Sequence, residues 1–230
     1  MKKLSMVIFV ILLSCNFALA KNEMNASEIV DQINNGEKIF LKNITIKGTL
    51  DFTELENIKL VSKSFFDGET YKSKVDVSLY FENCSFDNVI AFKYSKLNNT
   101  VYAADFQFST KFVNCEFNGD TEFKHSVFNK EVDFSGSVFS SEANFKYTNF
   151  KGPIGFKNAH FIESANFKYT HFSNKIDMSY VVIDGYANFK YTHFNRDLNI
   201  DGLKVNGEIN TKHASVGRTS FSKYLINREL

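Results

Sequence analysis

Large apolar residues recur along this chain at gaps that alternate between six and five residues. From residue 106 to residue 205 they are Phe106, Phe112, Phe117, Phe123, Phe128, Phe134, Phe139, Phe145, Phe150, Phe156, Phe161, Phe167, Phe172, Met178, Ile183, Phe189, Phe194, Ile200 and Val205. A small or β-branched residue precedes most of them by two positions, as Ala143 precedes Phe145. Residues two apart on an extended strand point to the same side, so each pair faces one interior. No apolar stripe with helical spacing is present, and the pattern predicts short strands.

The same stretch contains an octapeptide in three nearly identical copies, 22 residues apart: ANFKYTNF from Ala143, and ANFKYTHF from Ala165 and Ala187. Copies at a fixed period without linkers predict a solenoid, in which each turn of chain stacks on the last. The extra residue in each six-residue gap is never aliphatic, as expected of a corner turned to water: Asp120, Glu131, Glu142, Pro153, Ser164, Lys175, Tyr186, Asp197 and Glu208. Two short and two lengthened sides in 22 residues predict a four-sided coil.

These units resemble the repeat of the pentapeptide-repeat proteins, which is a small residue, then Asn or Asp, then Leu or Phe, then two polar positions. Ala143-Asn144-Phe145-Lys146-Tyr147 matches this unit position by position, and the resemblance covers roughly residues 39–216. It implies an all-β fold, a right-handed quadrilateral β-helix with stacked central Phe residues. The chain departs from the plain pattern, because its coil has 22 residues where four pentapeptides give 20, and because its central residue is Phe far more often than Leu.

The two ends of the repeat predict helical caps. In residues 21–38, Asn25 and Glu28 form an Asn-x-x-Glu capping pattern before three apolar residues, Ile29, Val30 and Ile33. A helix there would cover the exposed strand edges of the first coil. Residues 217–230 leave the repeat, and Thr219 is a candidate cap for a second helix that closes the other end. We therefore assign a solenoid to residues 39–216 and a cap to each side of it.

Two interruptions are expected inside the solenoid. Residues 61–74 break the periodicity and predict a surface loop. The segment from Phe81, FENCSFDNVIAFKYS, aligns with the segment from Phe112, FVNCEFNGDTEFKHS, at an offset of 31, which we interpret as one coil plus a nine-residue insertion near residues 98–106. About seven coils at roughly 4.8 Å each predict a rod about 34 Å long.

Residues 1–20 have the pattern of a secretory signal peptide. Lys2 and Lys3 precede an apolar run, and residues 18–20 offer a small-x-small cleavage site. The run is too short to span a bilayer. Alternatively, residues 12–15 resemble a bacterial lipobox, which would leave Cys15 lipidated as the new N-terminus and anchor the protein to a membrane. Either reading predicts export to the periplasm or the outside of a bacterial cell.

The charge of the mature chain argues against nucleic acid as a partner. Removing residues 1–20 takes away Lys2 and Lys3 and no acid, so 25 basic residues face 26 acidic ones and the net charge is −1. Neither a basic footprint for nucleic acid nor a strongly acidic surface is indicated. Some pentapeptide-repeat relatives are thought to mimic DNA and inhibit gyrase. That role implies a cytoplasmic, strongly acidic rod, and the leader and the charge both disfavour it here.

One column of the repeat carries lysine and the next carries an aromatic ring. The column positions are Lys124, Lys146, Lys168 and Lys190, followed by His125, Tyr147, Tyr169 and Tyr191, and the 31-residue alignment adds Lys93 and Tyr94. Like charges on adjacent strands repel, a cost that a ligand could offset. Tyrosine beside lysine suits an anionic glycan or a protein partner. The competing interpretation is a solvated face copied by recent duplication of the repeat.

Two further pairs are candidate sites. Cys84 and Cys115 occupy the small inward position of neighbouring coils, within reach of a disulfide in an exported protein, or else they are two buried thiols that fill space. His171 and His193 are one coil apart, and two imidazoles without a third ligand make a weak metal site. No cofactor site and no metal site is predicted.

The sequence favours an exported, non-catalytic β-solenoid that acts as a structural or interaction scaffold in the bacterial envelope, with an unidentified protein or glycan as partner. No nucleophile, base and orienting acid recur at matched positions, and acids such as Asp133 and Asp177 fall at scattered outward positions. The alternatives are a carbohydrate-active enzyme on a β-helix and, with less support, a gyrase-interacting DNA mimic. The sequence names neither the partner nor the oligomeric state.

Overall fold

The computed structural model describes residues 22–64, 68–195 and 197–226. The expected leader at residues 1–20, with Cys15, lies outside these residues, and so do residues 227–230 of the expected C-terminal cap.

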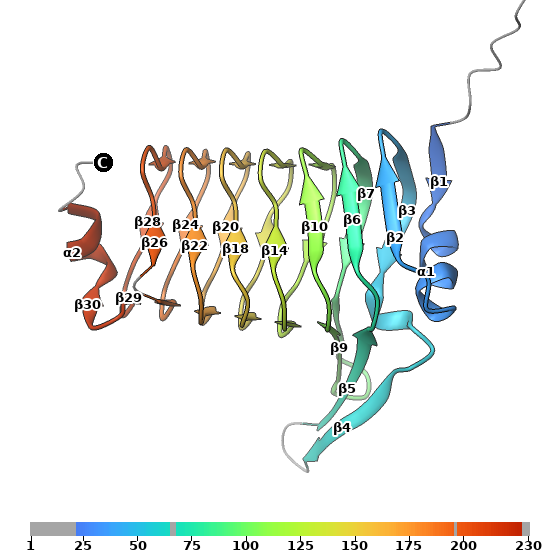
Figure 1. Cartoon of the computed structure of the whole chain (residues 1–230). Helices are drawn as coiled ribbons and strands as arrows, with labels where there is room; N and C mark the ends of the chain where they lie inside the picture. The colour runs from blue at the N-terminus through green and yellow to red at the C-terminus, as the bar shows by residue number, and fades with distance from the viewer. Residues whose placement is uncertain (1–21, 65–67, 196, 227–230) are drawn as a thin grey trace, which may run out of the picture.

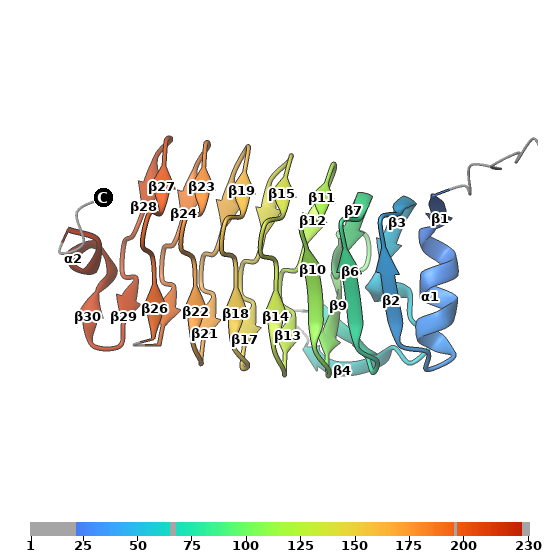
Figure 2. The ribbon, with the colours of Figure 1, turned by 45° about the horizontal axis from the view of Figure 1, so that its top comes forward.

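Short parallel strands stack in four columns, and each column is one wall of a solenoid (Figures 1 and 2). The first wall is β2 (Ile39–Lys42), β6 (Leu79–Glu82), β10 (Thr110–Val113), β14 (Val132–Asp133), β18 (Ile154–Gly155), β22 (Ile176–Asp177) and β26 (Leu198–Asn199). The second is β11 (Glu116–Phe117), β15 (Val138–Phe139), β19 (His160–Phe161), β23 (Val182–Ile183) and β27 (Lys204–Val205). The third is β12 (Thr121–Glu122), β16 (Ala143–Asn144), β20 (Ala165–Asn166), β24 (Ala187–Asn188) and β28 (Ile209–Asn210).

The fourth wall is β9 (Thr100–Phe106), β13 (Val127–Phe128), β17 (Asn149–Phe150), β21 (His171–Phe172), β25 (His193–Phe194) and β29 (Ser215–Val216), and β30 (Thr219–Ser220) pairs antiparallel with β29. At the N-terminal end, β1 (Glu23–Asn25), β3 (Thr45–Asp51) and β7 (Ser85–Ile90) join the second and third walls into one sheet. The seven strands of the first wall mark seven coils, as the periodicity predicts.

The register between regular coils is the 22-residue period of the sequence. Ala143 pairs with Ala165, and Ala165 pairs with Ala187. Within a coil, the third and fourth walls are joined by a four-residue turn, such as residues 145–148, and the fourth and first walls by a three-residue corner, such as 151–153. The predicted corner positions lie at such corners, where Glu142 and Pro153 are exposed. The four-sided coil is confirmed.

Stacked phenylalanine rings fill the interior. The ring of Phe167 lies 5.1 Å from that of Phe145 and 5.3 Å from that of Phe189, with interplanar angles of 5° and 3°, and all three are fully buried. Each buried Phe contributes about 1.5–3 kcal/mol through removal of apolar surface from water. The predicted Phe columns are therefore confirmed, and they are the main source of stability in this narrow fold.

Buried hydroxyl groups connect consecutive coils beneath the turns that join the third and fourth walls. Each threonine Oγ1 donates a hydrogen bond to the carbonyl oxygen of a Phe one coil earlier: Thr148 to Phe123 at 2.7 Å, Thr170 to Phe145 at 2.6 Å, and Thr192 to Phe167 at 2.6 Å. A buried hydroxyl without a partner would be costly, so these bonds explain why the inward position tolerates a polar residue.

A helix packs on each end of the described solenoid. The helix α1 (Ala26–Asn34) buries Ala26, Ile29 and Ile33, and the Oε1 atom of Glu28 accepts the backbone N–H of Asn25 at 3.1 Å. At the other end, α2 (Phe221–Ile226) places the Phe221 ring 4.7 Å from that of Phe194. Both helices cover apolar interior residues at the ends of the solenoid that would otherwise face water.

The expected surface loop at residues 61–74 is wrong. The strands β4 (Lys59–Ser64) and β5 (Gly68–Val75) form an antiparallel pair, and β8 (Phe92–Ser95) pairs antiparallel with β9. β5 also pairs in parallel with β9 of the fourth wall, and β4 and β5 form an arm that projects from the side of the solenoid beside β9 (Figure 1). The short 3-10 helix η1 (Phe52–Glu54) precedes the arm. Pairing with distant strands, which periodicity does not reveal, stabilises this segment as a sheet.

The expected 31-residue alignment holds only in part. Phe81 pairs with Phe112 and Phe86 with Phe117, both at that offset, but Val89 pairs with Thr121. The register therefore slips by one residue after Phe86. The consequence is that Ala91 is buried, and Phe92 lies partly exposed on the outer surface.

Candidate functional site

The predicted lysine and tyrosine positions lie at one series of turns, those between the third and fourth walls. The residue that follows the lysine has a left-handed backbone in every regular coil: φ is 59° at His125, 60° at Tyr147, 60° at Tyr169, 59° at Tyr191 and 59° at His213. An asparagine two residues before the lysine stabilises most of these turns through its side chain, as Asn166 Oδ1 accepts the backbone N–H of Lys168 at 3.2 Å. The Asn of the repeat thus has a structural role: it stabilises a turn in which the Phe is buried and the Lys and the aromatic residue after it are directed outward.

The aromatic rings at these turns form a continuous stack, which we call the ring ladder: Phe92, His125, Tyr147, Tyr169, Tyr191 and His213. Tyr169 lies 4.8 Å from both Tyr147 and Tyr191, with interplanar angles of 4° and 2°. The ladder continues to His125 and His213 at 4.7 Å, and Phe92 ends it 5.5 Å from His125. Face-to-face stacking covers the ring faces, so the partly exposed surface of each ring is its edge.

The lysines form a second column beside the rings, the lysine row: Lys124, Lys146, Lys168, Lys190 and Lys212. The Nζ atoms of Lys146, Lys168 and Lys190 lie 5.0, 5.2 and 5.4 Å from the centroid of the neighbouring tyrosine ring. Among the described residues, no lysine of this row makes an ion pair with a carboxylate. The row is therefore a line of positive charge without an ion-pair partner among the described residues, and the carboxylate of Glu122 raises the pKa of Lys124 against the larger effects that lower it.

Partial burial and mutual repulsion affect the ionisation of these groups. Burial lowers the pKa of Lys124, and the nearby charge of Lys146 lowers it further. Partial burial and the neighbouring tyrosines raise the pKa of Tyr169, so its phenol stays protonated and can donate a hydrogen bond. A bound anion would relieve the repulsion along the row.

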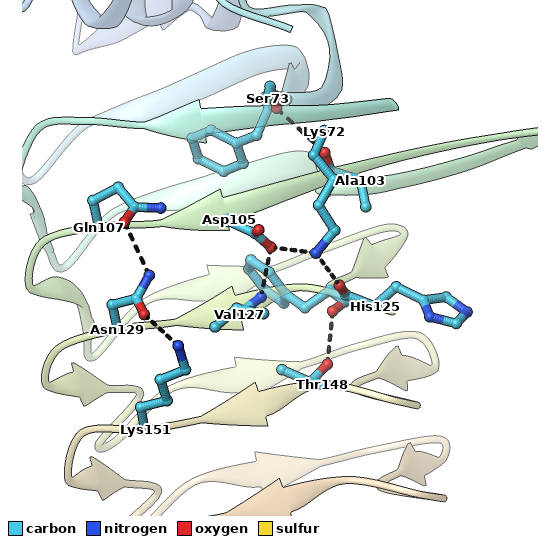
Figure 3. Close-up of polar contacts among 12 residues, drawn as sticks. Lys72, Ser73, Ala103, Asp105, Gln107, His125, Val127, Asn129, Thr148 and Lys151 are labelled. Atoms are coloured by element: carbon cyan, nitrogen blue, oxygen red, sulfur yellow. Dashed lines mark hydrogen bonds and ion pairs between the residues drawn. The ribbon is translucent and has the colours of Figure 1, made fainter. Parts of the chain in front are cut away.

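The N-terminal end of the ring ladder is tied to the projecting arm (Figure 3). Lys72 of β5 forms an ion pair with Asp105 of β9 at 2.7 Å and donates to the carbonyl oxygen of His125 at 3.2 Å. Asp105 also accepts the backbone N–H of Val127 at 3.0 Å. Burial and then the charges of Lys124, Lys72 and Lys146 lower the pKa of His125 to about 4. His125 is therefore neutral at pH 7 and behaves as an aromatic ring of the ladder.

The structure brings together all seven residues of the predicted binding stripe, Lys124, Lys146, Lys168, Lys190, Tyr147, Tyr169 and Tyr191. The assignment of Lys93 and Tyr94 to this stripe is wrong, because the one-residue slip places Phe92 beside His125. Lys93 instead forms ion pairs with Asp51 and Glu54. Lys212 and His213 also belong to these columns and were not predicted, although they follow Lys190 and Tyr191 by the same 22 residues.

Comparison with known protein families identifies the repeat. The family described as pentapeptide repeats (9 copies) matches residues 102–149, 145–193 and 156–204, which hold most of the ring ladder. Residues 102–204 of this chain belong to the pentapeptide-repeat family. The resemblance inferred from the octapeptide copies is confirmed.

Among solved structures, the chain is similar to HetL, a pentapeptide repeat protein involved in heterocyst differentiation regulation from the cyanobacterium Nostoc sp. strain PCC 7120. The identity is 12%, and the alignment covers 86% of this chain and 99% of HetL with a TM-score of 0.17. A likeness this distant carries no argument about function. No curated protein matches the chain.

Cys84 and Cys115 lie in neighbouring coils of the repeat as buried, free thiols. Each Sγ contacts a carbonyl oxygen of the preceding coil, Cys84 that of Leu41 at 3.5 Å and Cys115 that of Phe81 at 3.6 Å. Ser137 occupies the same position one coil later, where its Oγ donates to the carbonyl oxygen of Phe112 at 2.7 Å. The thiols thus take the place of the hydroxyl groups that link coils elsewhere. The neighbouring thiol of Cys115 lowers the pKa of Cys84.

The histidine pair stacks and does not converge on a metal position. The rings of His171 and His193 are 4.9 Å apart with an interplanar angle of 12°, and Nδ1 of His193 lies 2.8 Å from Oγ of Ser215. Burial and then the charge of His193 lower the pKa of His171. Within the described residues, no three His, Cys, Asp or Glu side chains gather where they could hold a metal ion.

The carboxylates that looked scattered in the sequence line one open groove. Glu131, Asp133 and Asp177 border a hollow of about 190 Å³ on the first wall, above Gly155. Oδ1 of Asp133 accepts the backbone N–H of Ser135 at 2.9 Å, and Asp177 does the same for Ser179 at 3.0 Å. Both aspartates therefore stabilise their own turns. Among the described residues, no helix combines the length and the apolar character needed to cross a bilayer.

Proposed function

We propose that this pentapeptide-repeat solenoid is an exported, non-catalytic interaction scaffold of the bacterial envelope, and that the lysine row with the ring ladder is its binding surface. The observation that carries this proposal is a row of five lysines that no carboxylate of the described residues pairs with. Like charges on adjacent strands destabilise a sheet unless something offsets the repulsion. A protein or glycan with negative charge would supply that offset.

The lysine–aromatic pair recurs in more coils than duplication of the octapeptide explains, and this supports a role in binding. Lysine followed by an aromatic residue occurs at Lys124-His125 and at Lys212-His213, outside the three octapeptide copies. Copying of the octapeptide alone does not account for these two coils. A ligand that contacts successive coils would require the same pair in each of them.

Export is supported by the pattern of residues 1–20, with lipidation of Cys15 as the other route. Fractionation of cells that express the full chain, with mass spectrometry of the mature N-terminus, tests both. Cleavage after Ala20 is the expected result. An acylated Cys15 would instead make the protein a membrane-anchored lipoprotein, and an uncleaved chain in the cytoplasm would contradict export.

The absence of catalysis is supported by the geometry of the described acids, since Asp133 and Asp177 each accept a backbone N–H of their own turn. A glycoside hydrolase needs two carboxylates placed on either side of a glycosidic bond, one of which keeps its proton. A hydrolysis screen against envelope glycans tests this part of the proposal. Turnover that is lost in Asp133→Asn or Asp177→Asn would make the protein an enzyme.

Binding is tested by retention of the purified protein on envelope fractions. The variant Lys146→Gln/Lys168→Gln/Lys190→Gln should lose most of the retention, because it removes three adjacent charges of the row. The matched control is Lys151→Gln/Lys157→Gln/Lys175→Gln, which removes equal charge from exposed positions on other faces of the same part of the solenoid. Equal retention by the two variants would mean that the row is not the binding surface.

A further inference from the structure

The ring ladder differs from the aromatic platforms that bind sugars or nucleobases by stacking. Those ligands need an open ring face. Here Tyr169 has Tyr147 on one face and Tyr191 on the other, each at 4.8 Å and within 4° of parallel. Tyr147, Tyr169 and Tyr191 are 40%, 38% and 39% exposed, and face-to-face stacking leaves this exposure to the ring edges and the phenol groups. Stacking of a neutral sugar or a base on these rings is therefore excluded by the geometry.

The exposed parts of the stripe all favour negative charge. The edge of an aromatic ring carries the positive part of its quadrupole. The phenol of Tyr169 stays protonated and is a hydrogen-bond donor. Beside each tyrosine, an ammonium group lies between 5.0 and 5.4 Å from the ring centroid. Carboxylate or sulfate groups of a ligand would meet donors and positive charge at every coil.

The shape of the stripe favours a linear polymer. Successive lysines follow the coil spacing of about 4.8 Å, so the row of five runs about 19 Å along the solenoid axis. Acidic side chains stand on the neighbouring corner, where Asp120, Glu142 and Glu208 are exposed. A flat anionic bilayer laid on this face would bring its charges against those acids. A single chain that follows the row would avoid them.

We propose that the lysine row and the ring ladder bind a linear acidic polysaccharide, with its chain along the solenoid axis and its carboxylate or sulfate groups on successive or alternate lysines. This inference rests on the proposed function and narrows its partner to one chemical class. The protein would recognise the acidic groups of the polysaccharide through charge and hydrogen bonds. The faces of the sugar rings would not stack on its aromatic side chains.

The test uses the purified full chain and polygalacturonate as the probe, with its fully methyl-esterified form as a neutral polymer of the same backbone. Binding to polygalacturonate is expected, and esterification should weaken it by roughly tenfold or more, because charged contacts dominate affinity for a polyanion. Raising the salt concentration should weaken it further. Equal affinity for the esterified polymer would overturn the inference.

Variants connect the binding to the stripe. Lys146→Gln/Lys168→Gln/Lys190→Gln should lose roughly tenfold or more in affinity for polygalacturonate, and Lys151→Gln/Lys157→Gln/Lys175→Gln should stay within about twofold of the unmodified protein. The variant Tyr147→Phe/Tyr169→Phe/Tyr191→Phe keeps the stacked rings and removes the phenol donors, so it should bind more weakly than the unmodified protein and remain folded. An equal loss of affinity in both lysine variants would show that binding depends only on the overall charge of the protein, and it would overturn the inference.

Competition separates this inference from the proposed function. Polygalacturonate should displace the protein from envelope fractions more effectively than single-stranded DNA or phosphatidylglycerol vesicles at equal charge. If retention depends on the lysine row but only DNA or vesicles compete, the polysaccharide inference fails and the proposed binding surface stands. If retention does not depend on the row, the proposed function fails as well.

Discussion

Two series of turns in this solenoid have the same left-handed backbone conformation but carry different types of side chain. The turns between the third and fourth walls carry His125, Tyr147, Tyr169, Tyr191 and His213, with φ of 59° or 60°. The turns between the first and second walls carry Asn114, Asn158 and Tyr180, with φ between 52° and 59°, and Gly136 and Gly202, with φ of 68° and 69°. Glycine and asparagine are the usual residues for a left-handed backbone, because a larger side chain costs roughly 1–2 kcal/mol there. The second series has glycine or asparagine at four of these five turns, whereas the first series has neither residue at any of its five turns.

The two series also fill space differently. A Cβ atom on Gly202 would lie 2.6 Å from the Tyr180 ring, and one on Gly136 would lie 2.1 Å from Oδ1 of Asn114. Glycine on the second series thus leaves room for the larger residue of the coil before it. The first series instead stacks rings without a gap, and each pair contributes roughly 0.5–1.5 kcal/mol beyond burial of its area. Stacking between the rings offsets much of the backbone strain, so a column made only of aromatic residues is tolerated. Binding of a ligand would explain why such a column is present in place of glycine and asparagine.

The largest effect is expected in the core beneath the first series. Phe167→Ala removes one ring from an unbroken phenylalanine column and should lower the free energy of unfolding by about 3–5 kcal/mol. Met178→Ala, beneath the second series, should cost about 2–3 kcal/mol, since methionine fills less specific space. Denaturant unfolding followed by circular dichroism measures both. A smaller loss for Phe167→Ala than for Met178→Ala would contradict the role given to the columns.

Acid should destabilise the first series through His125. Its pKa is about 4 in the folded protein and about 6.5 when exposed, so the folded state binds fewer protons than the unfolded state. The stability from this group is fully present above pH 6.5 and is lost as the pH falls toward 4, by about 2 kcal/mol once solvent screening is allowed for. Unfolding curves at pH 7, 5.5 and 4 measure it. His125→Tyr, which copies the next coil, should remove this part of the pH dependence.

The hydroxyl beneath each ring turn is expected to contribute a smaller amount. Thr170→Val removes the hydrogen bond to the carbonyl oxygen of Phe145 and should lower the free energy of unfolding by about 1 kcal/mol. The second series has Val181 at the matching position, so the reciprocal variant Val181→Thr is the control and should change stability by less than the first. Thermal unfolding of the pair gives the comparison, and equal losses would show that the effect is only a change of shape.

The smallest effect on stability, and the most informative, is expected from exchange of the turn residues. Tyr169→Asn relieves backbone strain and loses two ring contacts, so its net effect should stay within about 1 kcal/mol of zero. Asn158→Tyr adds strain and can gain only one ring contact, with Tyr180 of the next coil, so it should be destabilising by about 1 kcal/mol. If Tyr169→Asn leaves binding to envelope fractions unchanged, the ring ladder is a feature of stability alone.

The sequence predicted the regular part of the fold well because contacts there repeat with the period. Phe145, Phe167 and Phe189 stack, and the seven predicted stripe residues lie together, since a constant spacing of 22 residues puts identical positions on top of one another. The prediction failed at residues 59–74 and again after Phe86, where the arm forms and Phe92 takes the place expected for Lys93 and Tyr94. Pairing there joins strands at irregular separations, which a periodic alignment cannot represent.

The sequence by itself determined the four-sided coil, the buried phenylalanine columns, the exposed corners and the single file of lysines, because each follows from alternation along a strand and repetition between strands. Only the tertiary structure decided the one-residue slip after Phe86, the arm, the free thiols and the closed faces of the stacked rings. The physical reason is that these features depend on the distances between side chains of different coils. Ring faces that are covered, and lysines that lack a carboxylate, are properties of neighbours in space.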